Sequence, residues 1–202
     1  MARVQIQTPQ GVIELRDEVR NPIYDSFDIL AGGAALLGTR SFFSNVQGKG
    51  RSQTNLRQNN ILESMVSFRI LGIGMHSQNI YAANANVMPL IMENSFVNLR
   101  ITEKTYYEGP VTLVAGKLDL SVALDGAAAP VQQLYQRYGQ VQDLGVVLGG
   151  KHFVDIAQLQ SFALDWTVEG LTATEQGIAT MAANTKLRVY GVLNGLLRRP
   201  VQ

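Results

Sequence analysis

Short stretches in which apolar and polar residues alternate recur along the chain, and they predict β-strands. In the clearest of them, Val97, Leu99 and Ile101 alternate with polar or charged neighbours. Because a strand turns every second side chain to the same face, such alternation is typical of half-buried strands. The predicted strands cover residues 4–7, 12–15, 35–44, 65–75, 96–107, 111–115, 118–124, 158–169 and 186–197. About eight strands without long helices between them predict an all-β fold, a single antiparallel jelly-roll sandwich with short helices in its loops.

The first 34 residues have a weaker pattern than the rest. Thr8-Pro9-Gln10-Gly11 lies between two alternating stretches and has the proline and glycine placement of a type I turn, so a hairpin is expected there. Asn21-Pro22 then predicts a break, and Ile23–Leu30 shows no clear period. We therefore expect residues 1–34 to form an N-terminal arm loosely attached to one jelly-roll domain at residues 35–202.

Three segments have helical signals. Val87, Leu90, Ile91 and Asn94 lie at helical spacing, and Thr172-x-x-Glu175 has the form of a capping box before residues 173–183. Another helical face follows Pro130 and predicts a short helix in a loop insertion at about 127–142. That face comprises Val131, Leu134, Tyr135, Tyr138 and Val141.

Two strands are expected to be well covered. The stretch 65–75 is apolar on both faces, which is typical of a buried strand or of one at an interface. Trp166 shares a face with Phe162 and Leu164, so it is expected in the core.

Composition narrows the functional classes. The 202 residues are 46% hydrophobic and 16% charged, and 17 basic against 16 acidic residues leave a net charge of +1. Such a charge-poor chain favours a surface covered by copies of itself or by partners, and it argues against a general nucleic-acid binder, which needs a basic excess. The absence of cysteine excludes disulfides, thiol nucleophiles and cysteine-ligated metals. We find no signal peptide and no apolar run long enough to cross a bilayer.

Catalytic motifs are weak. Residues 145–151 match the phosphate-binding loop up to Lys151, but His152 stands where Ser or Thr is needed, and a strand is expected to follow. His76 and His152 do not form a close pair of the kind that a metal-dependent cupin uses. We expect no catalytic residue, no cofactor and no metal.

Basic residues cluster mildly between residues 39 and 70, where they outnumber a single acidic residue, Glu63. The cluster comprises Arg40, Lys49, Arg51, Arg57 and Arg69. Two interpretations are open: a patch that meets phosphates or a neighbour's carboxylates, or the charged rim of a solvated loop, which we favour because a few charges on a long loop are ordinary.

The order of several motifs resembles a known family. They are Thr39–Phe43 with Gly48-Lys49 and Gln53–Leu56; Ser67–Ile73; Lys104–Pro110; and Gln160–Leu164 with Leu187–Leu193 and Arg199-Pro200-Val201-Gln202. Together they resemble the jelly-roll capsid proteins of tailless icosahedral bacteriophages, whose jelly rolls stand upright in the shell and often enclose a membrane. The resemblance covers about residues 39–202. Many members carry two jelly rolls in a chain, whereas this chain has room for one, so a major, a paired and a vertex capsid protein all stay open.

The resemblance implies a structural protein of the virion, and not an enzyme, that self-assembles into an icosahedral shell. The implied partners are other copies in trimeric or hexameric capsomers, other capsid proteins and an internal lipid membrane, with no sequence-specific nucleic acid. Removing residues 1–34 should then impair assembly and leave the sandwich folded.

Apolar and aromatic residues beyond what one strand face can bury, together with the basic C-terminal end, are candidates for subunit contacts. The predicted interface residues are Ile23, Tyr24, Phe27, Phe42, Phe43, Tyr135, Tyr138, Arg198 and Arg199. The alternative is a carbohydrate- or receptor-binding jelly roll of a spike or fibre, with Trp166 or Tyr106-Tyr107 as an exposed platform; an enzyme of cupin or glycosidase type ranks third.

Overall fold

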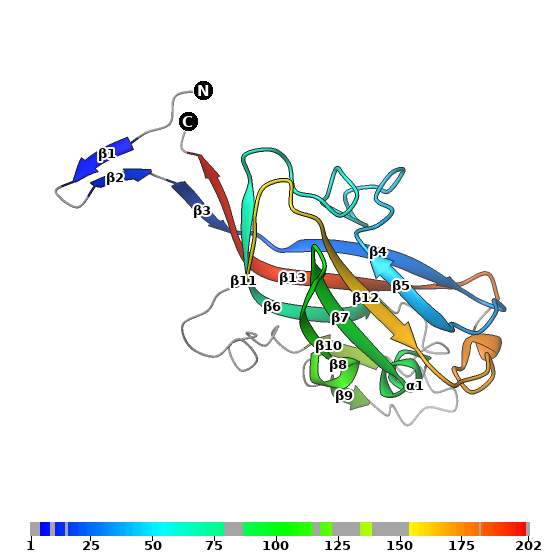
Figure 1. Ribbon diagram of the computed structural model, residues 1–202. Helices are drawn as coiled ribbons and strands as arrows, with labels where there is room; N and C mark the ends of the chain where they lie inside the picture. Colours follow the sequence, from blue (N-terminus) through cyan, green and yellow to red (C-terminus); the bar gives the residue numbers. More distant parts are fainter. Residues whose placement is uncertain are drawn as a thin grey trace.

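The longest strand, β13 (Lys186–Pro200), organises the first of two antiparallel sheets (Figure 1). The computed structural model describes residues 5–8, 11–14, 16–78, 87–114, 118–122, 134–138, 154–181 and 183–200. One side of β13 pairs with β6 (Ser67–Gln78), which also pairs with β11 (Val154–Ile156). The other side pairs with two successive strands, β4 (Ile23–Leu30) and β3 (Arg16–Arg20).

The second sheet has the order β5-β12-β7-β8. Its strands are β5 (Gly38–Phe42), β12 (Phe162–Val168), β7 (Ser95–Ile101) and β8 (Lys104–Pro110). Outside the two sheets, β1 (Gln5–Thr8) pairs with β2 (Gly11–Glu14), and β9 (Leu118–Val122) pairs with β10 (Leu134–Tyr138). The short helices are α1 (Val87–Glu93), α2 (Val111–Val114) and the 3₁₀ turn η3 (Ile178–Thr180).

The strand pairing has the topology of a jelly roll. Among the eight core strands the first pairs with the last, β4 with β13, and the same nesting continues inward through β5 with β12, β6 with β11, and β7 with β8. A long antiparallel ribbon has thus folded across itself to give two four-column sheets, the arrangement of a double-sheet jelly roll. The predicted fold class, an all-β sandwich with short helices, is confirmed.

Aromatic side chains fill the space between the sheets. The ring of Phe27 lies 5.0 Å from that of Phe42 and 5.2 Å from that of Trp166, centroid to centroid. Trp166 is fully buried, as its alternation predicted. Gly191 makes room for this cluster, because a Cβ atom there would lie only 2.6 Å from the Phe42 ring.

Several local predictions are confirmed. The hairpin β1–β2 forms where it was expected, and the segment at 84–95, whose pattern was ambiguous, contains helix α1. The capping box forms as well, with Thr172 and Glu175 each donating a backbone N–H to the other's side chain. Residues 65–75 lie largely in a central strand, but a register shift moves the buried positions from Phe68 and Ile70 to Ile73 and Met75. This β-bulge explains why the sequence looked apolar on both faces.

Other local predictions are wrong. The expected strand 111–115 is helix α2 at Val111–Val114, whose buried residues Val111 and Val114 are three positions apart, a helical spacing. The expected helix at 127–142 is a strand at Leu134–Tyr138, held by antiparallel pairing with β9 that local periodicity does not reveal. The remaining residues of that segment lie outside the described part of the chain, as does the loop 145–152.

Two strands were also misjudged. The stretch 96–107 is a hairpin of β7 and β8, which turns at Thr102-Glu103 with Thr102 at a φ of 56°. Residues 23–30, expected to belong to a loosely attached arm, form β4, whose Ile23 and Ile29 are 3% and 4% exposed. The part that leaves the sandwich is shorter: β1, β2 and β3, with the end of β13 (Figure 1).

Candidate assembly surfaces

The edge strand β4 is covered by the long connection at residues 43–66, which we call the strap. Asn55 acts as a substitute strand: its backbone N–H donates to the Tyr24 carbonyl at 3.3 Å, and its side-chain oxygen accepts the Tyr24 N–H at 3.0 Å. The Asn55 amide nitrogen also donates to the carbonyl of Pro22 at 2.7 Å. The strap therefore occupies backbone groups that would otherwise be open to another chain.

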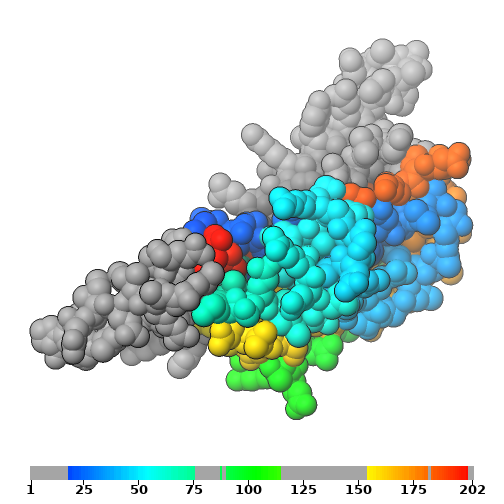
Figure 2. Space-filling model, turned by 90° about the horizontal axis from the view of Figure 1, so that it is seen from above, coloured from blue at the N-terminus to red at the C-terminus, as the bar shows by residue number. Residues whose placement is uncertain are grey.

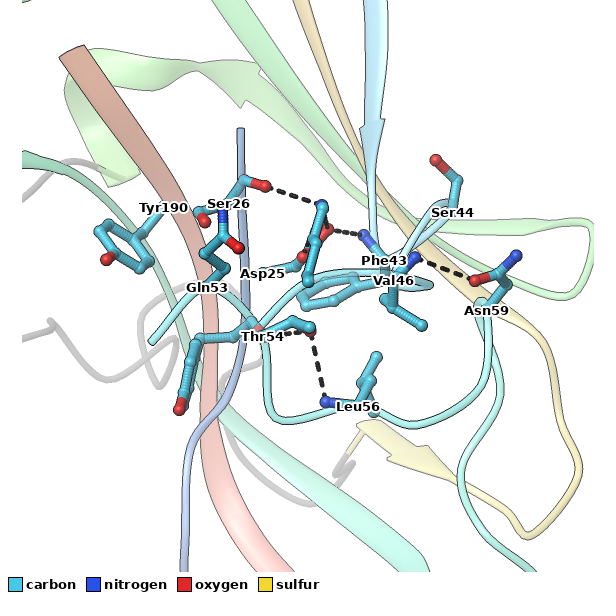
Figure 3. A network of polar contacts seen from close by, with 12 residues as sticks. Asp25, Ser26, Phe43, Ser44, Val46, Gln53, Thr54, Leu56, Asn59 and Tyr190 are labelled. Atoms are coloured by element: carbon cyan, nitrogen blue, oxygen red, sulfur yellow. Dashed lines mark hydrogen bonds and ion pairs between the residues drawn. The ribbon is translucent and has the colours of Figure 1, made fainter. Parts of the chain in front are cut away.

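A buried ion pair fixes the strap to the sandwich (Figure 3). Asp25 points inward from β4 and is 1% exposed. Its carboxylate accepts hydrogen bonds from Lys49 at 2.8 and 2.9 Å and from the backbone N–H of Phe43 at 2.8 Å. Lys49 also donates to the carbonyl of Ser26 on the open side of β4. Buried charges are tolerated when they are paired and hydrogen-bonded in this way.

Apolar and polar anchors hold the rest of the strap. Val46 and Leu62 are 4% and 2% exposed, and the hydroxyl groups of Tyr24 and Tyr190 donate to strap carbonyls at Arg51 and Ser52. In Figure 2 the cyan atoms of the strap form a continuous layer over this side of the sandwich. The Gly-Lys-Gly segment at 48–50 is thus a bonded part of the structure.

The other edge strands of the sandwich are short or carry residues and bulges that discourage strand pairing. Strand β11 has three residues and β5 has five. Strand β8 carries Lys104, Pro110 and a register shift opposite Leu99 and Arg100. Short strands, lysine, proline and bulges all discourage pairing with a foreign strand. Within the described residues, the sandwich therefore closes its own edges.

The arm, which from here on means β1, β2, β3 and residues 196–200 of β13, differs from the sandwich in the state of its strand edges. β3 pairs with residues 196–200 of β13, and no described segment pairs with its other edge. In the described part of the chain the hairpin β1–β2 has no sheet partner either, and its register places Ile6 opposite Ile13. Because an isolated two-stranded hairpin is only marginally stable in water, this arrangement favours a partner for the arm.

Charges cross the root of the arm from strand to strand. Arg198 on β13 pairs with Glu18 on β3, and another nitrogen of its guanidinium lies 3.7 Å from the Asp155 carboxylate on β11. Arg69 on β6 donates two hydrogen bonds of 2.9 and 3.2 Å to the same Asp155 carboxylate. These bonds raise the pKa of the Arg69 guanidinium. At the far end of the same sheet, Arg188, with help from Lys186, lowers the pKa of Asp28.

A shallow cavity of about 140 Å³ lies beside the arm root, between the strap and the end of β13. Its apolar lining includes Ile23, Leu62 and Leu197, and its polar residues include Arg199. It is too small for a drug-sized ligand, which usually occupies about 300–1,000 Å³.

The predicted interface residues fall into three groups. Ile23, Phe42 and Phe43 are buried in the chain's own core, so the prediction that they contact other subunits is wrong. Tyr24 and Phe27 are half-buried, the first under the strap and the second in the aromatic cluster. Each has its main partner within the chain.

The remaining four residues lie on the arm and on β10. Arg198 and Arg199 lie on the arm, the first ion-paired and the second exposed. Tyr135 and Tyr138 lie on β10, opposite Ser121 and Leu118 of β9.

The basic cluster between residues 39 and 70 does not gather into one patch. Lys49 pairs with Asp25, Arg57 with Glu63 at 3.1 Å, and Arg69 with Asp155. Arg40 lies over the Phe27 ring, 5.6 Å from its centroid. The interpretation as the charged rim of a solvated loop fits the exposed Arg57 alone among these four, because Lys49 is in a buried ion pair and Arg40 and Arg69 lie on strands β5 and β6.

Candidate chemistry is sparse in the part of the chain that the structure describes. It contains no group of three or more histidines, aspartates and glutamates placed to hold a metal. It also contains no helix that is long and apolar enough to span a bilayer. His76 lies on β6 beside Tyr190 of β13, while His152 falls outside the described residues.

Sequence patterns missed Asp25 and Asn55, the two residues that tie the edge strand to the strap. A signal for Asp25 was present, because it occupies the inward register between Ile23 and Phe27. No local signal marks Asn55, since its role depends on a strand 31 residues away.

Comparisons with protein-family models, curated proteins and solved structures find no match for this chain.

Proposed function

We propose that this protein is a structural subunit of an icosahedral viral shell and that its copies associate through the arm. The observation that carries the proposal is the contrast between a jelly roll that closes its own edges and a ribbon that leaves it with an open edge. A domain that needed no partner would have little reason to expose such a ribbon, because unpaired strand edges invite association.

The fold and composition support the same proposal. Double-sheet jelly rolls recur in viral capsids, and also in lectins and cupins, so the fold alone does not choose among these functions. The low charge content and the net charge of +1 reduce repulsion between closely packed copies. The bacteriophage lineage, with other shell proteins and an underlying membrane as partners, rests on the sequence resemblance and is the finest part of the proposal.

The carbohydrate-binding alternative lacks the exposed tryptophan that it would use. A glycan platform needs an exposed aromatic ring, whereas Trp166 is fully buried between the sheets. Tyr106 is half-buried, with the Lys104 ammonium 5.0 Å from its ring centroid. We therefore keep the shell as the one proposed function.

The test is the native mass of the purified protein by light scattering, with electron micrographs of the same sample. The proposal predicts capsomer-sized oligomers or closed particles whose proportion rises with protein concentration. A protein that stays monomeric at the highest soluble concentration and binds a glycan array would contradict the proposal and favour a binding module.

A further inference from the structure

The outer edge of β3 has no strand partner among the described residues. Its partner strand β13 pairs with it from Arg20↔Leu196 to Arg16↔Pro200, and nothing in the described part of the chain lies against its other side. Arg20 is exposed, and Val19 is one of the exposed large apolar residues, at 38%. Like β5 it is short, and four of its five residues are charged, but unlike β4 it has no described segment along its edge.

The contacts of neighbouring residues show which backbone groups of β3 face the open side. The N–H of Asn21 donates inward to the Gly195 carbonyl on β13, whereas Pro22 and Tyr24 direct their backbone groups outward to Asn55. Successive residues of a strand direct these groups to alternate sides. The N–H and C=O groups of Glu18 and Arg20 therefore face outward, and those of Val19 face β13.

We propose that β3 pairs antiparallel with β3 of a second copy around a two-fold axis at Val19. The inference rests on the proposed function, because it names the contact through which two copies of the arm meet. In an antiparallel pair, an outward-facing residue must lie opposite another outward-facing residue. This condition leaves only every second register.

Charge then selects among the allowed registers. Centring the pair on Glu18 or on Arg20 places like charges opposite each other, and centring it on Asp17 places two aspartates at the axis. Centring it on Val19 places each Glu18 opposite the Arg20 of the other copy and brings the two valines together. Opposite charges and apolar pairs stabilise cross-strand contacts, whereas like charges directly opposite each other destabilise them. Only this last register satisfies both conditions.

The resulting contact is isologous, since the same residues contribute from both copies. It joins two β3–β13 ribbons into one four-stranded sheet between two sandwiches. With five residues from each copy, it is smaller than the interface of about 1,200–2,000 Å² that a stable complex buries, so it contributes to a shell as one of several weak contacts.

The experiment is a disulfide cross-link, which is clean because the chain has no cysteine of its own. In the proposed register Val19 faces its own copy in a non-hydrogen-bonded pair, with Cα atoms about 4.5 Å apart, within the range that a disulfide spans. The full chain with Val19→Cys, in a glutathione redox buffer, should form a covalent dimer roughly tenfold faster, or more, than the full chain with Leu159→Cys. Leu159 is a matched control, because it is also an exposed apolar residue but lies on a turn of the sandwich.

A second pair of variants tests the strand edge itself. Arg20→Pro removes an outward N–H and leaves the inward ladder to β13 intact, because proline is tolerated where the N–H faces away from the sheet. Arg20→Ser removes the same charge and keeps the donor. In the Val19→Cys background, cross-linking should fall to the Leu159→Cys rate with Arg20→Pro and fall less with Arg20→Ser. Equal rates in all backgrounds, or no advantage of Val19→Cys over Leu159→Cys, would overturn the pairing.

The outcomes separate this inference from the proposed function. Particles in the micrographs without selective cross-linking would overturn the β3 contact and leave the shell proposal standing. Selective cross-linking without any species larger than a dimer would support the β3 contact and contradict the shell.

Discussion

Strands β3 and β4 follow each other in the chain and pair with the same side of β13, yet their outer edges are treated in opposite ways. The strap covers β4 with the side chain and backbone of Asn55 and with the buried Lys49–Asp25 pair. β3 has an ion pair to Arg198 on its face, but nothing in the described structure lies along its edge. The two strands differ in what lies beside them, and not in how they pair with β13.

This difference separates a strand that the folded domain needs, β4, from a strand that is free to contact another copy, β3. β4 supplies Ile23, Ile29 and Phe27 to the core, so its edge must be blocked for the sandwich to stay soluble and correctly paired. β3 supplies no residue to the described core. It is available for a contact between copies without cost to the folded domain.

The largest effect is expected from moving the point of truncation across Asn21. Deleting residues 1–34 removes β4, and the loss of a core strand exceeds the roughly 5–15 kcal/mol by which a domain is stable. Deleting residues 1–20 removes only the ribbon, so the sandwich should stay folded while its oligomers disappear. Circular dichroism and light scattering on both variants measure the two effects. Equal folding of both variants would mean that β4 belongs to the arm after all.

The next effect is expected at the ion pair that holds the strap. Lys49→Met leaves the Asp25 carboxylate buried without its partner, which should cost about 3 kcal/mol of the free energy of unfolding. Adding Asp25→Asn should recover much of that loss, because the uncompensated charge is gone. Lys186→Met is the matched control: its ion pair with Asp28 is 55% exposed on the lysine side, so the change should stay below about 0.5 kcal/mol. Urea denaturation of the natural chain, Lys49→Met, Lys49→Met with Asp25→Asn, and Lys186→Met measures these differences. A similar loss of stability for Lys49→Met and Lys186→Met would contradict the role given to the buried ion pair.

A smaller effect is expected at the substitute strand. Asn55→Ala removes the side-chain bonds to the Tyr24 N–H and the Pro22 carbonyl, which should cost about 1 kcal/mol and bare part of the β4 edge. Asn45→Ala, at an exposed position of the same strap, is the control and should be nearly neutral. If both variants aggregate equally little on heating, the edge-covering role of Asn55 is wrong.

The smallest effect is expected in how the stability contributed by Asp28 depends on pH. Hydrogen bonds from Arg188, with further help from Lys186, lower the pKa of Asp28 in the folded state. A carboxylate with a lowered pKa stabilises the fold above its unfolded pKa of about 3.9, and that contribution is lost as the pH falls through the folded value. Asp28→Asn should therefore be less stable than the natural chain at pH 7, by about 1 kcal/mol, and nearly equal to it near pH 2. A difference that persists unchanged at low pH would rule out this cause.

The sequence was a good guide wherever one strand face follows the simple alternation. It predicted the sandwich, the β1–β2 hairpin and the burial of Trp166. It failed where a tertiary partner overrides the local pattern. Asp25 interrupts the apolar face of β4, and its acceptability depends on Lys49, which is 24 residues away.

Turns without the usual residues were also hard to predict. The Thr102-Glu103 turn between β7 and β8 contains no glycine or asparagine, although Thr102 has a positive φ. It is held by the connection between β11 and β12, where the Ser161 carbonyl accepts a hydrogen bond of 2.7 Å from the Thr102 N–H.

The assembly surface followed a similar rule. Aromatic content pointed to Phe42 and Phe43, but Phe42 faces the core from the end of β5, and Phe43, which follows it with a φ of 70°, is buried as well. The edge of β3 is open because no described strand lies beside it. A local sequence pattern does not show which strands will be neighbours in the sheet.

Hydrogen exchange of individual backbone amides, in the monomer and in the assembled protein, tests the contrast between the two edges most directly. The account predicts that the Tyr24 amide, which donates to Asn55, is protected in both states. The outward amides of Glu18 and Arg20 should exchange rapidly in the monomer and become protected on assembly. Rapid exchange of Arg20 in both states, or of Tyr24 in the monomer, would contradict it.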